Sequence, residues 1–328
     1  INRGGIFAQL LGSWWLLEET DRRYLKGFIV NQFRGDSSLF ENGRSILEQR
    51  SQGIPVLGVL PWLEKLSLPD EDAASFSSDT ICNSDAKPVY VIRFPHISNF
   101  DDFDPLRFET GISLRYITHP GELINAAAIL LPGTKNTLED LCWLNETGLD
   151  NAICKHANSG CSVVGICGGY QMLGNQICNP QHIECSQESV AGLELLPVHT
   201  ILNSQKHTQL SEMRVISKIG FWHEMFGKTL TGYEIHNGQT RTDAPLFITE
   251  NNGFDGCAAN GGRIFGTYLH GLFGNNAFRQ SWLRSLDIQP VEKNWQEHQS
   301  AQLDRLANHL EAHLDMERIT QIIEDGVQ

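Results

Sequence analysis

Several features that would assign other classes of protein are missing from this 328-residue sequence. No apolar run approaches the roughly 20 residues of a membrane-spanning helix, and the N-terminus lacks the pattern of a signal peptide. The eight cysteines contain no C-x-x-C pair and follow no regular spacing, which favours reduced thiols over a disulfide framework. We therefore expect a cytoplasmic protein without a membrane partner.

Positive charge is also scarce. The chain has 25 lysines and arginines against 39 aspartates and glutamates, a formal net charge of −14, which argues against nucleic acid as the main partner. Hydrophobic residues make up 41% and charged residues 20% of the chain. This balance is typical of globular proteins, and the length allows two domains, each with its own core.

The sequence contains no P-loop motif G-x-x-x-x-G-K-[ST], the usual cradle for nucleotide phosphates. It opens at Ile1, inside a pattern that resembles a strand-to-loop transition. We interpret it as a piece of a longer protein.

The most informative stretch is residues 160–174, where a β-branched strand pattern at 162–166 meets glycines directly. Cys167 is the centre of G-x-C-x-G, the cysteine form of the nucleophile elbow. Glycines leave room for the strained turn that such a nucleophile needs, and a helix expected from Gly169 would favour the thiolate through its N-terminal N–H groups. The N–H of Gly168 is placed to hold an oxyanion. The alternative is a buried structural cysteine beside a glycine turn.

Strand and helix patterns divide the chain into four segments. Residues 1–68 contain strand, helix and strand, which is too little for a domain and indicates the back half of one. Residues 69–87 are rich in Asp, Ser and Ala and are interpreted as a linker. Residues 88–280 form a second α/β domain, and residues 281–328 a helical extension. In the second domain, strands are predicted at 89–94, 113–118, 126–131 and 162–166, with antiparallel strands at 231–238 and 262–273 closing the sheet.

A thiolate needs a base, and the sequence offers twelve histidines. His270 is preferred because it follows a predicted strand, adjoins a glycine and lies far downstream of the cysteine, as a partner adjacent in space would. His236 ends a similar strand and is the second choice. For any single histidine, a surface or core role is the default.

A second candidate turn is Pro132-Gly133-Thr134-Lys135. It follows a predicted strand at its carboxyl end, where α/β proteins place their sites. The N–H of Gly133 is therefore a candidate second oxyanion donor, with a plain Pro-Gly turn as the alternative.

Two sequence patterns contain residues that can bind a metal ion, but we predict no metal site at either. His309 and His313 share a helix face, but the spelling is not H-E-x-x-H and no third ligand is apparent, so a packing helix is simpler. Residues 101–104 (DDFD) could bind a cation or form a solvated loop with an aromatic anchor.

These residues resemble a known family. Residues 165–171 (GICGGYQ) are similar to the elbow of class I glutamine amidotransferases, which hydrolyse glutamine through a cysteine thioester. More narrowly, four segments over the whole chain resemble the cobyric acid synthase family of cobalamin biosynthesis. They are residues 97–106 (ISNFDDFDPL), 131–135 (LPGTK), 231–236 (TGYEIH) and 265–273 (FGTYLHGLF).

The resemblance implies an α/β fold in two parts. The first is the C-terminal half of a dethiobiotin-synthetase-like P-loop α/β domain, and the second a flavodoxin-like class I glutamine amidotransferase domain. In the family, the first domain activates carboxylates with ATP and Mg²⁺ and the second supplies ammonia from L-glutamine, with no covalently bound cofactor. Carboxylates b, d, e and g of adenosylcobyrinic acid a,c-diamide become amides, giving cobyric acid. The missing P-loop half then either belongs to the same protein in frame or is a separate partner of this chain.

Carried onto this sequence, the resemblance makes Cys167 the nucleophile and His270 the base. It makes Gly133 and Gly168 the oxyanion donors and Gln171 a contact to bound glutamine.

The sequence departs from the wider pattern in two places. Many class I enzymes follow the histidine with Pro-Glu, whereas Gly271-Leu272 follow here, so we expect a Cys-His dyad with Glu234 as a stand-in carboxylate. Asn2 stands where the family carries an aspartate expected near the nucleotide's metal. Asn31 and Arg34 are retained as candidate nucleotide-side residues.

Two rival functions stay open at this point. The chain could be the glutaminase of another synthetase, such as one that acts on a cell-wall precursor. It could also be a non-catalytic remnant that acts as a binding protein.

Overall fold

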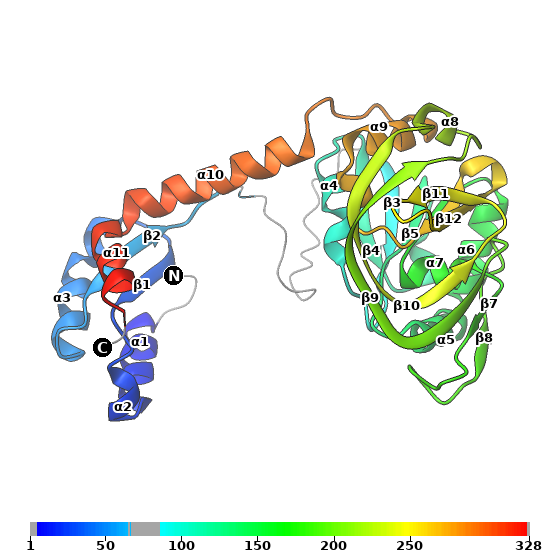
Figure 1. Ribbon diagram of the computed structural model, residues 1–328. Coiled ribbons are helices and arrows are strands. Elements are labelled where there is room, and N and C mark those ends of the chain that lie inside the picture. The colour runs from blue at the N-terminus through cyan, green and yellow to red at the C-terminus, as the bar shows by residue number, and fades with distance from the viewer. Residues whose placement is uncertain (1–4, 65, 67–85, 327–328) are drawn as a thin grey trace. The chain divides into compact units, whose positions relative to one another are not determined.

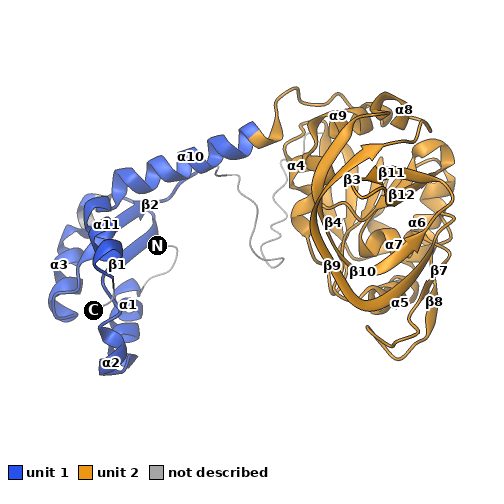
Figure 2. Cartoon of the chain, viewed as in Figure 1, with its two compact units in different colours: residues 1–68, 297–328 blue, residues 69–296 orange. Residues whose placement is uncertain are grey.

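The computed structural model describes residues 5–64, 66 and 86–326 (Figure 1). The chain divides into two compact units: residues 1–68 with 297–328 form unit 1, and residues 69–296 form unit 2 (Figure 2). The expected linker at 69–87 and Asn2 lie almost wholly outside the described residues. Among the described helices, none combines the length and apolar character needed to cross a bilayer.

Unit 1 is built on a two-stranded parallel sheet of β1 (Phe28–Phe33) and β2 (Val56–Pro61). The crossover between them runs through η1 (Ser37–Phe40) and α3 (Glu41–Arg50), as parallel neighbours require. Helices α1 (Ile6–Leu16) and α2 (Glu19–Arg22) precede the sheet. The small core consists of Leu11, Trp14, Phe28, Val30, Phe40, Leu47 and Val56.

The C-terminal helices α10 (Trp295–His313) and α11 (Met316–Asp325) join unit 1 from residue 297 onward. The expected single extension at 281–328 is therefore divided. The reason is a close backbone approach, because a Cβ at Gly58 of β2 would lie 2.4 Å from the carbonyl oxygen of His313. The His309 Nε2–H also donates to the Pro61 carbonyl at 2.9 Å, and His313 Nδ1–H donates to the His309 carbonyl at 2.8 Å. Both histidines serve helix packing.

Unit 2 contains an eleven-stranded sheet whose centre is five parallel strands in the order β4-β3-β5-β6-β13. In chain order this is 2-1-3-4-5, the flavodoxin-like arrangement, which places ligand sites beyond the carboxyl ends of the strands. Burial on both faces suits their apolar sequences. The five strands are β3 (Lys87–Ile92), β4 (Ile112–Ile117), β5 (Ala128–Leu131), β6 (Ser162–Ile166) and β13 (Ile264–Thr267).

The segment at 262–273 corrects one sequence prediction. We expected an antiparallel strand, but β13 pairs parallel to β6 and antiparallel only to β12. The carboxyl end of β13 consequently reaches the same edge of the sheet as the end of β6.

The sheet continues beyond β13 in the order β12-β11-β9-β7-β8, and β10 pairs with β9. These neighbours are antiparallel except β7 and β9, which are parallel. Strands β9 and β10 form a long curved ribbon across this part of the unit (Figure 1). The bounds are β7 (Gln176–Cys178), β8 (Ser189–Ala191), β9 (His199–Val215), β10 (Thr229–Arg241), β11 (Pro245–Thr249) and β12 (Phe254–Ala259).

Helices pack on the parallel strands, with α6 against β6, α4 against β4, and α7 against β5, β6 and β13. Asn136 caps α5 by accepting from the Glu139 N–H at 3.2 Å. The helical segments of unit 2 are η3 (Phe100–Phe103), α4 (Asp104–Arg107), η4 (Pro120–Glu122), α5 (Thr137–Thr147), α6 (Leu149–Asn158), α7 (Gly168–Leu173), α8 (Trp222–Met225), η5 (Asn260–Gly262), η6 (Leu272–Gly274) and α9 (Asn276–Ser285).

A buried ion pair fixes α9 to the loop after α4. Arg279 Nε lies 2.7 Å from Glu109 Oε1, and both side chains are fully buried. Changing Glu109 to Ala leaves a buried guanidinium without its carboxylate, so we expect urea unfolding to lose about 3–5 kcal/mol of stability. The control is Glu139→Ala, whose half-exposed side chain should cost no more than about 1 kcal/mol. Equal losses in the two variants would contradict the assignment.

Candidate active site

Cys167 occupies a strained turn between β6 and α7. Its backbone has φ 53° and ψ −109°, a region that non-glycine residues rarely adopt. The flanking glycines are sterically required, because a Cβ at Gly169 would lie 2.0 Å from the Leu131 carbonyl oxygen and one at Gly165 would lie 2.6 Å from Gly169. The turn therefore has the geometry of a nucleophile elbow.

His270 lies just beyond the end of β13, next to the elbow strand. The register pairs Ile166 with Thr267, and the Cys167 N–H donates to the Thr267 carbonyl at 2.9 Å. The imidazole is fully buried, and its Nε2 has no hydrogen-bond partner within the described part of the chain. The structure thus brings the two candidate catalytic residues to neighbouring strand ends, with one ring nitrogen free for proton transfer.

The partner of His270 is Asp102, a residue that the sequence analysis did not single out for this role. Its Oδ2 lies 2.8 Å from His270 Nδ1, and its Oδ1 accepts the Gly271 N–H at 2.7 Å. Asp102 sits in η3, and its carboxylate is almost wholly buried. The described arrangement is therefore a candidate Cys-His-Asp triad whose carboxylate comes from η3, after β3.

Glu234 does not take the place expected of it as the stand-in carboxylate. Its oxygens contact Ser211, Gln209 and His236 rather than His270. The expectation of a solvated loop at residues 101–104 is also corrected, since Asp102, Phe103 and Asp104 are all buried. Two phenylalanines flank two aspartates in residues 100–103 (FDDF), and this apolar flanking is the sequence signal that could have indicated a buried aspartate.

The charge state of His270 follows from its surroundings. Burial opposes the imidazolium, but the Asp102 carboxylate and the Cys167 sulfur together raise the pKa of His270 from 6.5 to about 10. A protonated imidazole beside a cysteine favours the thiolate, which is the reactive form.

The raised pKa of His270 predicts a pH-dependent stability. A group whose folded pKa lies above its unfolded value contributes stability that is complete below about pH 6.5 and is lost as the pH rises through about 10. We expect the urea midpoint of the wild type, followed by near-ultraviolet circular dichroism, to fall across this window more than that of His270→Gln. Parallel falls in both proteins would refute the coupling.

Tyr233 packs against a face of the His270 imidazole and is itself held by Asn99. The Tyr233 ring stacks on His270 with 4.9 Å between ring centroids and 13° between planes. The Asn99 amide donates to the Tyr233 hydroxyl at 2.9 Å. Burial, together with the nearby Asp102 and Asp101, raises the pKa of Tyr233, so the phenol stays neutral beside the base.

The two predicted oxyanion donors lie beside the triad. Gly168 is the first residue of α7, so its N–H has no acceptor within that helix. A Cβ at Gly133 would lie 3.2 Å from His270 Cε1, and one at Gly168 would lie 2.6 Å from Thr134 Cγ2. At both glycines, therefore, no side chain covers the backbone next to the site.

A cavity of about 300 Å³ opens at Cys167. Its lining includes Gln171, Asn237, Lys135 and Lys206. The Gln171 Nε2–H donates to the Tyr268 hydroxyl at 3.0 Å, while Gln171 Oε1 and Asn237 Oδ1 are buried acceptors without a partner within the described residues. Unpaired buried acceptors that face a cavity indicate a ligand with N–H groups.

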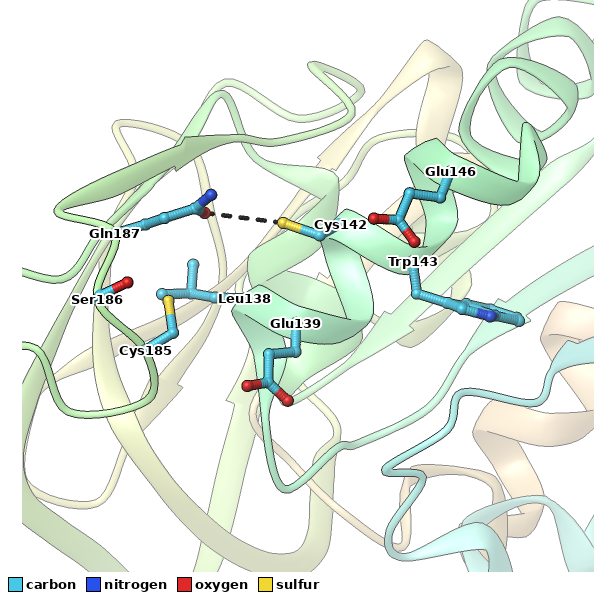
Figure 3. A pocket seen from close by; sticks show the side chains of 8 residues that line it. All are labelled: Leu138, Glu139, Cys142, Trp143, Glu146, Cys185, Ser186 and Gln187. Atoms are coloured by element: carbon cyan, nitrogen blue, oxygen red, sulfur yellow. Dashed lines mark hydrogen bonds between the residues drawn. The ribbon is translucent and has the colours of Figure 1, made fainter.

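A second hollow of about 290 Å³ lies between α5 and residues 185–187 (Figure 3). It contains two thiols, and Cys142 Sγ–H donates to Gln187 Oε1 at 3.7 Å. Burial, and the neighbouring Cys185, Glu146 and Glu139, raise the pKa of Cys142. Its thiol is therefore a poor nucleophile, in contrast to the one beside His270.

Asn31 and Arg34, the two candidate nucleotide-side residues, belong to unit 1. The Arg34 guanidinium sits 4.0 Å above the Trp62 ring, and Asn31 Oδ1 accepts the N–H of Gln32 at 2.8 Å. Both side chains are exposed.

The site combines a cysteine elbow, a histidine bound to a carboxylate and backbone N–H groups that no side chain covers. All of them lie at the carboxyl edge of a flavodoxin-like sheet. This arrangement defines a cysteine-dependent amidotransferase site of the class I type. Comparison with known proteins gives the family. Residues 88–278 match the model of the CobB/CobQ-like glutamine amidotransferase domain, so the chain belongs to that family.

Individual relatives agree with this assignment. The chain is 47% identical to the cobyric acid synthase of Chloroflexus aurantiacus over 96% of its own length and 64% of the relative's. It is 45% identical to that of Roseiflexus castenholzii, over 99% and 66%. The chain is a homologue of these enzymes and spans about two thirds of their length. Among solved structures, PurLQS from Thermotoga maritima is 18% identical with a TM-score of 0.47, over 61% of this chain and 97% of that one.

Proposed function

We propose that this chain hydrolyses L-glutamine at Cys167 and supplies the ammonia for amide formation on a corrinoid, as the glutaminase-bearing part of a cobyric acid synthase. The observation that carries the proposal is the buried contact between His270 and Asp102 beside the cysteine elbow. It gives the nucleophile both a base and an orienting carboxylate.

The first chemical step forms a thioester. The Cys167 sulfur attacks the side-chain carbonyl carbon of glutamine, and the backbone N–H groups of Gly133 and Gly168 stabilise the oxyanion of the tetrahedral intermediate. As the carbon–nitrogen bond breaks, His270 Nε2 gives its proton to the leaving nitrogen, which departs as ammonia. Asp102 keeps the second ring proton on Nδ1.

The second step releases glutamate. His270, now neutral, takes a proton from water, whose oxygen attacks the thioester carbon. The carbon–sulfur bond breaks, and the thiolate–imidazolium pair is restored. No redox change or cofactor is needed for this half of the reaction.

The cavity at Cys167 suits glutamine. The partnerless Gln171 Oε1 and Asn237 Oδ1 can accept from N–H groups of the substrate, namely its α-ammonium and its carboxamide. Lys135 and Lys206, both exposed on the cavity lining, place positive charge where the α-carboxylate can reach it. We assign the substrate role of Gln171 on this basis.

The identity of the molecule that accepts the ammonia is inferred from the family. We propose adenosylcobyrinic acid a,c-diamide as acceptor and its carboxylates b, d, e and g as the sites amidated. The described residues of unit 1 do not fit ATP and Mg²⁺ by themselves, since Asn31 and Arg34 are exposed and no buried polar atom there lacks a partner. The ATP-dependent step is therefore assigned to a P-loop half, whether that half belongs to the same protein or to a partner.

The test has two stages. Full-length chain incubated with L-glutamine should release ammonia and glutamate in equal amounts, and L-asparagine should be a poor substrate because it is one methylene shorter. After addition of ATP, Mg²⁺, the corrinoid and a P-loop half, mass spectrometry should detect four new amides. Ammonia release without corrinoid amidation would favour the glutaminase of another synthetase. No release under either condition would favour a binding protein.

A further inference from the structure

Two imidazoles and one carboxylate meet across the β9–β10 ribbon, outside the triad. His207 belongs to β9, and Glu234 and His236 belong to β10. His207 and His236 are directly opposite each other in the antiparallel register, and one ligand atom from each of the three residues lies within 4.8 Å of the other two. Imidazole nitrogen and carboxylate oxygen are common ligands of transition metals.

The tautomer of His236 is fixed by its backbone contact. Its Nδ1 lies 2.7 Å from the Gly238 carbonyl oxygen, which can only accept, so the proton is on Nδ1. Its Nε2 lies 3.3 Å from Glu234 Oε2. In the neutral ring that nitrogen bears a lone pair facing a carboxylate oxygen, and a positive species, either a proton or a metal ion, is needed between the two atoms.

The Glu234 carboxylate is oriented in the same way. Its Oε1 accepts from the Ser211 hydroxyl and from Gln209 Nε2, the latter at 3.1 Å, which leaves Oε2 directed at His236. The Glu234 side chain is 8% exposed and that of His236 is 11% exposed. The His236 imidazole is thus oriented by a backbone carbonyl, and the Glu234 carboxylate by a hydroxyl and an amide. In metal sites, outer contacts of this kind orient the ligands.

The spacing also suits a metal. Zinc bonds of about 2.0–2.2 Å to nitrogen and oxygen in a tetrahedron separate the ligand atoms by about 3.3–3.6 Å. The measured 3.3 Å between His236 Nε2 and Glu234 Oε2 equals one edge of such a tetrahedron. The ligand atom of the exposed His207 lies within 4.8 Å of the other two, so a rotation of its side chain would bring it to a third position.

We propose that His207, Glu234 and His236 bind a divalent transition-metal ion of the zinc type. A ligand set of two imidazoles and a carboxylate favours such an ion over Mg²⁺ or Ca²⁺, which prefer oxygen ligands alone. The ion links β9 to β10 where the ladder shifts register, between His236 and Gly238. It also holds both neighbours of Ile235, whose carbonyl oxygen lies 3.4 Å from Cys167 Sγ.

The experiment measures metal binding directly. Zinc chloride is titrated into the metal-free full-length Cys167→Ala protein by calorimetry, because that background removes the reactive thiol as a competing ligand. We expect one site that is weakened at least about tenfold by His207→Ala, since loss even of an outer contact typically costs 10–100-fold in affinity. Magnesium chloride should give no comparable heat.

A matched control is His223→Ala, in which an exposed histidine of α8 is removed. It should bind zinc like its parent. His207 is exposed, so its replacement should leave the circular dichroism spectrum unchanged, and zinc should raise the melting temperature of the parent but not of the His207 variant. Glu234→Gln should also lose the site. Equal zinc affinity in the parent and His207→Ala, or no binding in the parent, would leave the Glu234–His236 contact as a proton-mediated ion pair and overturn the proposal.

Discussion

Replacing Cys167 by alanine is expected to reduce ammonia release from L-glutamine by about 10⁴–10⁶-fold, the range seen when a covalent nucleophile is removed from a preorganised site. The sulfur forms the thioester bond, and no other described group at the elbow can replace it. Alanine has the same Cβ as cysteine, so the replacement adds no backbone strain at φ 53°. The measurement is glutamate formation by chromatography, with folding checked by circular dichroism.

The matched control for this variant is Cys142→Ala, which removes a protonated thiol in the hollow beside α5 (Figure 3). Its rate should equal that of the wild type. A wild-type rate in Cys167→Ala, or a large loss in Cys142→Ala, would place the nucleophile elsewhere.

The second large effect is expected from Asp102→Asn. The amide keeps the size of the carboxylate but removes the charge that fixes the Nδ1 proton and stabilises the imidazolium of His270. In catalytic triads such a change costs up to about 10⁴-fold in kcat, and we expect a loss of about 10²–10⁴-fold here. Because Asp102 acts through His270 and does not touch the substrate, KM for glutamine should change little.

The control is the adjacent Asp101→Asn, which alters an exposed carboxylate of the same turn and should leave kcat nearly unchanged. Steady-state kinetics on both variants also distinguish a loss of His270 positioning from a loss of folding. Misfolding lowers the concentration of active sites but does not shift the pH profile of the sites that remain. For Asp102→Asn the pH profile of kcat/KM should shift to lower pH, since the neutral partner no longer raises the pKa of His270. An unchanged profile with unchanged kcat would support the Cys-His dyad predicted from sequence.

Much of the parallel sheet could be predicted from the sequence because its strands carry strong local signals. The β-branched runs at 89–94 and 162–166 and the glycines around Cys167 specify buried strands and a tight turn without help from distant residues. The pairing direction of β13 could not be derived in this way. Periodicity within Ile264–Thr267 is the same for parallel and antiparallel neighbours, and only the fold as a whole decides between them.

The third member of the triad depends on the same kind of long-range information. Asp102 and His270 are separated by 168 positions, and the local pattern at 100–104 can indicate a buried carboxylate but not that it meets His270. Glu234 was expected to stand in as the carboxylate of His270. Alternation along β10 instead places it on one face with His236, and its oxygens contact His236, Ser211 and Gln209.

The chain leaves unit 1 after residue 68 and returns at residue 297, so unit 2 is an insertion within it. While unit 2 is folded, most of the chain between the two parts of unit 1 is already ordered, so docking of α10 on β2 costs little further chain freedom. If unit 2 unfolds, the same stretch becomes a long flexible loop whose closure opposes docking of α10 on Gly58, by an amount that grows slowly with loop length. Melting of the amidotransferase domain therefore weakens the small sheet that it interrupts, and a single protease cut cannot release either unit intact.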